Sequence, residues 1–466
     1  MVNLGRRNFL RDMACGVGTM ALGDLMAADG LGDPLLPRKP HFPAKAKSVI
    51  FMFMEGGPSQ YDLFYPKPEL QKWHGKPLPE SMTKEMQLAF IKPNAAVLAS
   101  PRTFQKHGQS GLEFSDYLPH TATCADDICM VRSMYSEAFN HHPGQLMLFT
   151  GTTQIGRPTV GAWSVYGLGS ESRNLPGFVV LTSGAGTSGG ATNFSSGFLP
   201  SVYQGTTLRS SGDPILYLSN PPGVSDSMQR AGLDALRDLN AERQMATGDP
   251  EIASRIAAYE LAYRMQMAGP ELVDFSKENA ATLELYGIGK EPTDKFARNC
   301  LLARRMVERG VRFILMTHAS WDDHTNLNSK LKKNCDMTDR PTAALLQDLK
   351  RLGLLDTTAV VWGGEFGRTP MQEVRNTLDP ENAGRDHHPM AYTMWMAGGG
   401  FKGGTAVGTT DDLGYAITAD KVHIHDLQAT LMHNLGFDHA KLTYRHMGRD
   451  FRLTDVEGQV VRKVLA

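Results

Sequence analysis

Residues 48–58 read SVIFMFMEGGP, an apolar run over Ser48–Met54 that is followed by Glu55 and a glycine turn. A short continuous apolar run with a glycine turn is typical of a central strand in a parallel sheet, because such a strand is buried on both faces. We therefore predict a central strand here. Glu55 would lie at its carboxyl end, the edge at which open α/β sheets place their functional sites.

Similar runs recur along the chain and predict further strands over 128–134, 178–182, 311–317, 358–362 and 392–396. Between them, apolar residues at three-to-four spacing predict helices, chiefly over 144–149, 253–267, 294–309, 341–352 and 425–435. Strands that alternate with helices favour an α/β fold: a doubly wound, mostly parallel sheet flanked by helices, with a helical insertion.

The chain has 466 residues, more than a single compact core usually holds, so one large domain with insertions or two domains are expected. We predict one domain over 45–466 with a loop and helical insertion at about 183–300. The 48 Lys and Arg residues nearly cancel the 49 Asp and Glu residues. We therefore expect no nucleic-acid partner.

The N-terminus has the pattern of a twin-arginine export signal. Arg6 and Arg7 precede Phe9 and Leu10, a weakly apolar stretch follows, and small residues at 27 and 28 offer a cleavage site. The alternative is an amphipathic helix that is not cleaved. We predict a signal over 1–28, a proline-spaced linker over 29–44, and export by the twin-arginine machinery to the periplasm or the cell exterior. The apolar stretch is too short to span a bilayer, so no transmembrane span is expected after signal removal.

Carboxylates and histidines gather at several predicted strand ends. They are Glu55, His141 and His142, the group Asp322, Asp323 and His324, then Glu365, and finally Asp386, His387 and His388. Divalent Zn, Mn, Mg or Ca binds such sets of side chains. Any one of these residues alone is more often a solvated turn residue or a packed side chain. Their repetition at strand ends predicts a metal site with Glu55, Asp322, His324, Glu365, His387 and His388 as ligands.

Taken together, these residues resemble the bacterial exported family called domain of unknown function 1501, within the alkaline phosphatase-like superfamily that includes sulfatases and phosphodiesterases. The resemblance covers nearly the whole chain. It rests on the segments 55–62, 285–287, 304–305, 321–324, 365–370, 384–389, 425–427 and 448–452.

The superfamily resemblance implies roles for particular residues. Glu55 corresponds to the acidic metal ligand after the first strand, and Asp322 with His324 to a later Asp and His. The superfamily's nucleophile begins a short helix, and His141 stands at that position. Where the superfamily has an Asp-His pair, this chain has Glu365 and Phe366. Without a hydroxyl or thiol at the helix start, the usual covalent intermediate cannot form there.

The leading hypothesis is an exported, metal-dependent hydrolase of phosphate or sulfate esters, acting on a small molecule or a polysaccharide. The metal would help water to ionise near neutral pH. His141 or His142 would be a ligand or a general base, and Arg368 or Arg385 would clamp the oxyanion. The alternative for both arginines is a structural ion pair. The alternative function is a non-catalytic binding or scaffold protein with a degenerate site on the same fold.

Overall fold

The computed structural model describes residues 33–84, 86, 88, 91–92, 94–184, 186–209, 220–373 and 382–466. The predicted signal over 1–28 and the first part of the predicted linker lie outside the described residues. The rest of that linker packs on the domain, where Phe42 N donates to Gly436 O at 3.1 Å and Arg38 N donates to Leu168 O at 2.8 Å. Within the described residues, no helix combines the length and apolar character that crossing a membrane requires.

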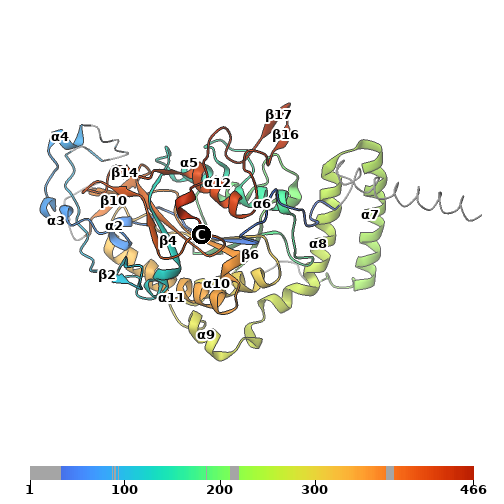
Figure 1. Cartoon of the computed structure of the whole chain (residues 1–466). Helices are drawn as coiled ribbons and strands as arrows, with labels where there is room; N and C mark the ends of the chain where they lie inside the picture. The colour runs from blue at the N-terminus through green and yellow to red at the C-terminus, as the bar shows by residue number, and fades with distance from the viewer. Residues whose placement is uncertain are drawn as a thin grey trace, which may run out of the picture.

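A mixed, mostly parallel sheet forms the centre of the described chain (Figure 1). Its strands run in the order β12 (Thr405–Val407), β4 (Ile128–Tyr135), β11 (Tyr392–Ala397), β8 (Thr358–Gly363), β1 (Ser48–Met54), β7 (Phe313–His318), β5 (Phe178–Ser183) and β6 (Thr206–Arg209), and β15 (Val422–His423) pairs with β4. β1 is parallel to both neighbours, with Val49 opposite Phe313 and Ser48 opposite Thr358. Only β11, among these described strands, runs antiparallel to its partners.

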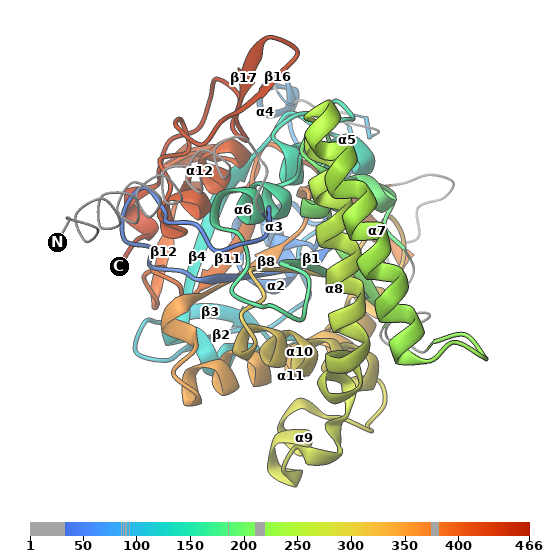
Figure 2. The same ribbon diagram turned by 90° about the vertical axis from the view of Figure 1, so that its right-hand side faces the viewer.

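Helices cover both faces of the sheet, so the predicted doubly wound α/β fold is confirmed. In Figures 1 and 2, α10 (Asp294–Glu308) and α11 (Leu327–Arg351) lie below the sheet, while α6 (Val160–Leu168) and α12 (Ile424–Asn434) lie above it. Successive side chains of β1 point to opposite faces and enter two cores. Ile50 and Met52 pack with the α10 and α11 side, whereas Phe51 and Phe53 pack with the other.

Helices are also observed where a loop and helical insertion is predicted, at about 183–300. α7 (Asp226–Thr247) and α8 (Pro250–Val273) form a hairpin that stands beside the sheet (Figure 2), and α9 (Ala280–Tyr286) follows. Ser225 and Asp249 cap the two long helices, because their side chains accept from backbone N–H groups of the first turn.

Two elements differ from the prediction. α11 begins at Leu327 rather than near 341 and continues through Pro341, because Leu331, Cys335 and Leu345 on one face are buried against the core. Residues 384–388, which precede the predicted strand over 392–396, form a strand of their own, β10 (Gly384–His388), paired antiparallel with β9 (Gly367–Glu373). Both strands are buried throughout, so the sequence lacks the alternation that would reveal them.

Candidate metal centre

Three neighbouring strands bring the polar residues to one edge of the sheet. β8, β1 and β7 are adjacent and parallel, so the segments that follow them meet there. Trp321 N donates to Glu55 O at 3.0 Å and ties the turn after β7 to the turn after β1. Gly56 has a φ of 118°, and a Cβ atom at this position would lie 2.4 Å from Asp322 N. Glycine is therefore required for the two turns to approach.

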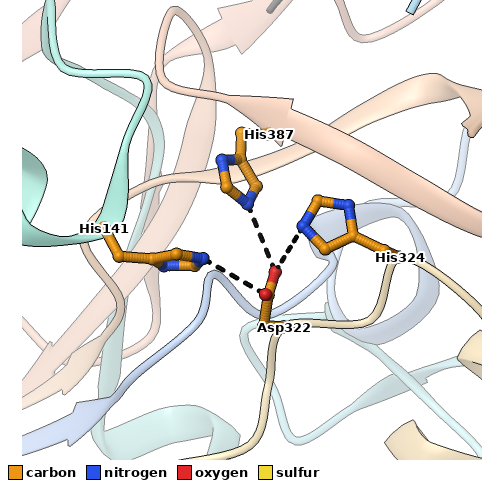
Figure 3. Close-up of side chains that lie close together, drawn as sticks. All are labelled: His141, Asp322, His324 and His387. Carbon is orange, nitrogen blue, oxygen red and sulfur yellow. Dashed lines mark hydrogen bonds and ion pairs between the residues drawn. The ribbon is translucent and has the colours of Figure 1, made fainter. Parts of the chain in front are cut away.

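Three histidines surround the carboxylate of Asp322, and we call His141, Asp322, His324 and His387 the Asp322 cluster (Figure 3). The Nε2 atoms of His324 and His387 lie 2.8 and 3.2 Å from Asp322 Oδ1. His141 Nε2 lies 3.3 Å from Asp322 Oδ2. His141 begins α5 (His141–Thr150), His324 follows β7, and His387 lies in β10. One ligand atom from each of the four residues fits within a span of 4.8 Å.

The outer ring nitrogens of two of these histidines are already engaged. His324 Nδ1 bonds to the carboxylate of Glu373 on β9. His387 Nδ1–H donates to Phe139 O at 2.7 Å. Metal-binding histidines commonly donate one ring N–H to a carboxylate or a backbone carbonyl, which orients the other nitrogen and its lone pair. In both residues that other nitrogen is the Nε2 that faces Asp322.

The buried side chain of Arg368 also contacts the Asp322 carboxylate. Its guanidinium is fully buried, and Nη2 donates to Asp322 Oδ1 at 2.7 Å. Its remaining donors reach backbone carbonyls, including Gly57 O at 2.8 Å and Arg385 O at 2.9 Å. Burial alone favours the neutral form of Asp322, but the three histidines and Arg368 outweigh it and hold its pKa far below the usual range. The carboxylate is therefore ionised at any physiological pH.

A second group of ligand atoms shares His141 with the first, and we call Glu55, His141 and Glu365 the Glu365 cluster. His141 Nδ1 lies 2.7 Å from Glu365 Oε1. Gln145 Nε2 lies 3.1 Å from Glu55 Oε1 and 3.4 Å from Glu365 Oε1. Burial, and then the charge of Glu365, raise the pKa of Glu55. Burial lowers the pKa of His141, but its hydrogen bonds with Asp322 and Glu365 prevail and raise it to about 9.

The donor set of the Asp322 cluster fits a divalent ion of borderline softness. Imidazole nitrogens with one carboxylate are typical ligands of Zn and of other first-row transition metals. Mg and Ca prefer oxygen ligands, which three histidines do not offer. The Nε2 atoms of His324 and His387 already converge, so these residues need little rearrangement to hold such an ion.

Two predicted residues are not brought to either cluster. His388 Nε2–H donates to Tyr415 O at 2.8 Å, and burial lowers its pKa to about 4. It lies next to His387 in β10, and neighbouring residues of a strand point to opposite sides. Arg385 is fully buried and pairs with Asp62, with Nε 2.9 Å from Oδ2, so the structure places it away from any oxyanion at the Asp322 cluster.

His142 and Phe366 lie at the margin of the two clusters. His142 Nε2 lies 3.3 Å from Thr192 Oγ1 rather than beside a carboxylate. Phe366 is buried, and its ring centroid lies 4.3 Å from that of His387 and 5.2 Å from that of His141. It therefore packs against two of the histidines instead of contributing a ligand.

Gln145 and Glu373 are functional candidates that the sequence reasoning missed. Gln145 lies four residues after His141 in α5, so helical spacing places both on one face and would have revealed it. Glu373 is separated from His324 by 49 residues and meets it only through the β9–β10 pairing, which has no local signal in the sequence.

Several solved structures resemble this chain. The PsFucS1 sulfatase from Pseudoalteromonas sp. matches with 12% identity over 91% of this chain and 71% of its own, at a TM-score of 0.36. A protein in the alkaline phosphatase superfamily from Vibrio parahaemolyticus matches with 11% identity over 95% and 78% of the two chains, also at 0.36. The alkaline phosphatase from the Antarctic bacterium TAB5 matches with 12% identity over 76% and 92%, at 0.30.

The search of curated proteins finds no match. The sequence model described as "Protein of unknown function (DUF1501)" matches residues 46–465. That match spans nearly all of the chain, including the sheet and both clusters. The protein therefore belongs to the DUF1501 family.

Proposed function

We propose that the protein is a metal-dependent hydrolase of phosphate or sulfate esters, with a divalent ion held by His141, Asp322, His324 and His387. The observation that supports it most is the convergence of three Nε2 atoms on one carboxylate, two of them oriented through Nδ1 by Glu373 and Phe139 O. When bound, such an ion promotes ionisation of water near neutral pH and neutralises charge on the ester oxygens.

The surrounding residues hold this centre in place. Arg368 fixes the Asp322 carboxylate, and Gln145 holds Glu55 and Glu365 next to each other. A second ion could be bound by ligand atoms of the Glu365 cluster, namely carboxylate oxygens of Glu55 and Glu365 and Nδ1 of His141. Glu55 is partly exposed to solvent, and burial together with the charge of Glu365 raises its pKa, which favours a role as a proton acceptor. His388 and Arg385 lie outside this site, because His388 is hydrogen-bonded to Tyr415 O and Arg385 is paired with Asp62.

The alternative is a non-catalytic binding protein on the same fold. Two residues support this alternative. His141 stands at the start of α5, where the superfamily carries its nucleophile, and Phe366 packs where a metal ligand is expected. The first difference removes the usual covalent nucleophile, and the second removes one expected metal ligand. The two functions predict different results in one assay.

The deciding assay is a screen of phosphate and sulfate esters with wild-type protein, before and after chelation and metal readdition. The hydrolase predicts turnover that chelation abolishes, that readdition restores, and that Asp322→Asn lacks. The exposed substitution Asp336→Asn is the matched control and keeps full turnover. If metal-loaded wild type cleaves no ester, the binding protein becomes the better account.

We also propose that the protein is exported by the twin-arginine route, since Arg6 and Arg7 precede an apolar stretch. Replacing both arginines with lysine is expected to retain the protein in the cytoplasm, and cell fractionation measures this. Unchanged export of the double variant would contradict the twin-arginine route.

A further inference from the structure

A cleft of about 590 Å³ opens beside the Asp322 cluster. The ends of β5 and β7 and the first turns of α10 and α11 form its walls, and Asp322 lies in both the cleft wall and the cluster. Small-molecule sites typically have volumes of about 300–1,000 Å³. The cleft is therefore large enough for a ligand that extends away from the proposed metal centre.

Lysines from two helices line this cleft. Lys330 and Lys333 lie on α11 together with Asn334 and Met337, and their spacing of three, four and seven residues places all four on one face of the helix. Lys295 comes from the first turn of α10.

These lysines place positive charge along the wall of the cleft. Lys330 Nζ donates to Thr325 Oγ1 at 3.3 Å. Lys295 and Lys333 are exposed, and within the described part of the chain neither has an ion-pair partner. Glu291, Asp322 and Asp323 also line the cleft and offset part of this charge, although Asp322 is paired with Arg368 and burial raises the pKa of Asp323 to about 7. Ammonium groups bind oxyanions as point charges, so the lysines favour an anionic ligand.

A buried histidine supplies a donor deeper in the same cleft. His318, which is 3% exposed, lines the cleft, and its Nδ1 accepts a hydrogen bond from Trp321 Nε1 at 3.0 Å. The proton of the neutral ring is therefore on Nε2. Among the described residues we find no acceptor for this N–H. Because His318 lines the cleft, a ligand oxygen bound there could accept this hydrogen bond.

We infer that this cleft binds a second anionic group of the substrate, a sulfate, phosphate or carboxylate on a sugar or other polyol, while the ester to be cleaved lies at the Asp322 cluster. The inference rests on the proposed function. The lysines supply charge, and His318 supplies a directed N–H. A free inorganic anion would fill only a small part of the volume, which is why the ligand is a group on a larger molecule.

Binding of a disulfated disaccharide and its monosulfated counterpart, measured by calorimetry at low salt, tests this inference. We expect wild type to bind the disulfated sugar about tenfold more tightly, an advantage that Lys330→Ala/Lys333→Ala removes and that added salt weakens. Lys332→Ala is the matched control, because Lys332 lies on the same helix but pairs with Asp336 at 2.6 Å and lines a different hollow. This control should keep the advantage.

Equal affinity of wild type for the two sugars would overturn the inference, as would an equal loss in Lys332→Ala. Inorganic sulfate that binds as tightly as the disulfated sugar would assign the cleft to a free anion and overturn it as well. Each titration is repeated with chelator-treated protein. If no metal is found but the lysine-dependent advantage persists, the proposed hydrolase fails while the anionic site stands.

Discussion

The Asp322 cluster and the Asp62–Arg385 pair are both groups of charged side chains that include a residue of β10, yet they are built differently. Arg385 donates through Nε to Asp62 Oδ2 at 2.9 Å and through Nη1 to Leu98 O at 2.8 Å, and Asp62 also accepts from Ser59 Oγ at 2.5 Å. Both side chains are fully buried, whereas the Asp322 side chain is 39% exposed. The pair is closed, and the cluster is open on one side.

This difference indicates that the charges of the Asp62–Arg385 pair stabilise the fold, whereas those of the Asp322 cluster are available to bind a ligand. In the closed pair, each charge has its counter-charge and its hydrogen bonds, so nothing further can bind. In the Asp322 cluster, three ring nitrogens converge on one carboxylate, while the outer nitrogens of His324 and His387 are already engaged. Substitutions in the two regions should therefore affect different quantities: metal affinity in the cluster and the free energy of unfolding in the pair.

The largest expected effect is the loss of metal in Asp322→Asn. Removing the only carboxylate of the cluster should lower affinity by more than the roughly 10- to 100-fold that an outer partner costs. Elemental analysis of the purified variant measures it, with circular dichroism to verify folding. A folded Asp322→Asn protein that keeps its metal would show that the ion lies elsewhere.

Arg385→Ala should instead destabilise the fold. It leaves Asp62 buried and uncompensated, a change that typically costs about 3–5 kcal/mol. Urea unfolding gives the free energy of unfolding, and the fraction that remains folded should bind metal as wild type does. Retained stability together with lost metal would reverse the roles that we assign to the two regions.

Glu373→Gln tests the orientation of His324, and its expected effect on metal affinity is smaller than that of Asp322→Asn. The amide oxygen can still accept from Nδ1–H but carries no charge, so we expect metal affinity to fall by about 10- to 100-fold. Competition with a chromophoric chelator measures this change. An affinity equal to that of wild type would mean that Glu373 does not orient a ligand.

The smallest effect on metal is expected for His388→Gln, in contrast to the neighbouring His387→Gln, which should lose the ion. Burial lowers the pKa of His388 to about 4, so the folded state resists protonation that the unfolded chain accepts below its ordinary pKa of about 6.5. Stability therefore falls as pH drops from about 6.5 to 4. The variant should flatten this slope by about 1.4 kcal/mol per pH unit. An unchanged slope would show that His388 is not the group responsible.

Much of the architecture could be predicted from local patterns. The apolar runs over 48–54, 311–317 and 358–362 became neighbouring strands of the sheet, and the polar residues that follow them meet at one edge. A central strand is buried on both faces, so a continuous apolar run in the sequence is enough to predict it.

The rest depends on contacts between distant segments. The β9–β10 pairing decides that His387 faces Asp322 and His388 faces Tyr415, and no local pattern distinguishes the two histidines. The same holds for Arg385, whose partner Asp62 lies 323 residues away in the sequence. Tertiary packing, rather than residue type, therefore decides which of two adjacent histidines points into the site and which partner a buried charge takes.

The metal content of the protein, purified without chelator from the exported fraction, tests the central claim most directly. We predict at least one equivalent of zinc or another first-row transition ion in wild type and in His388→Gln, and none in Asp322→Asn. Wild-type protein that contains no metal, and whose melting temperature does not shift when zinc, manganese or iron is added, would contradict the claim that the Asp322 cluster is a metal centre.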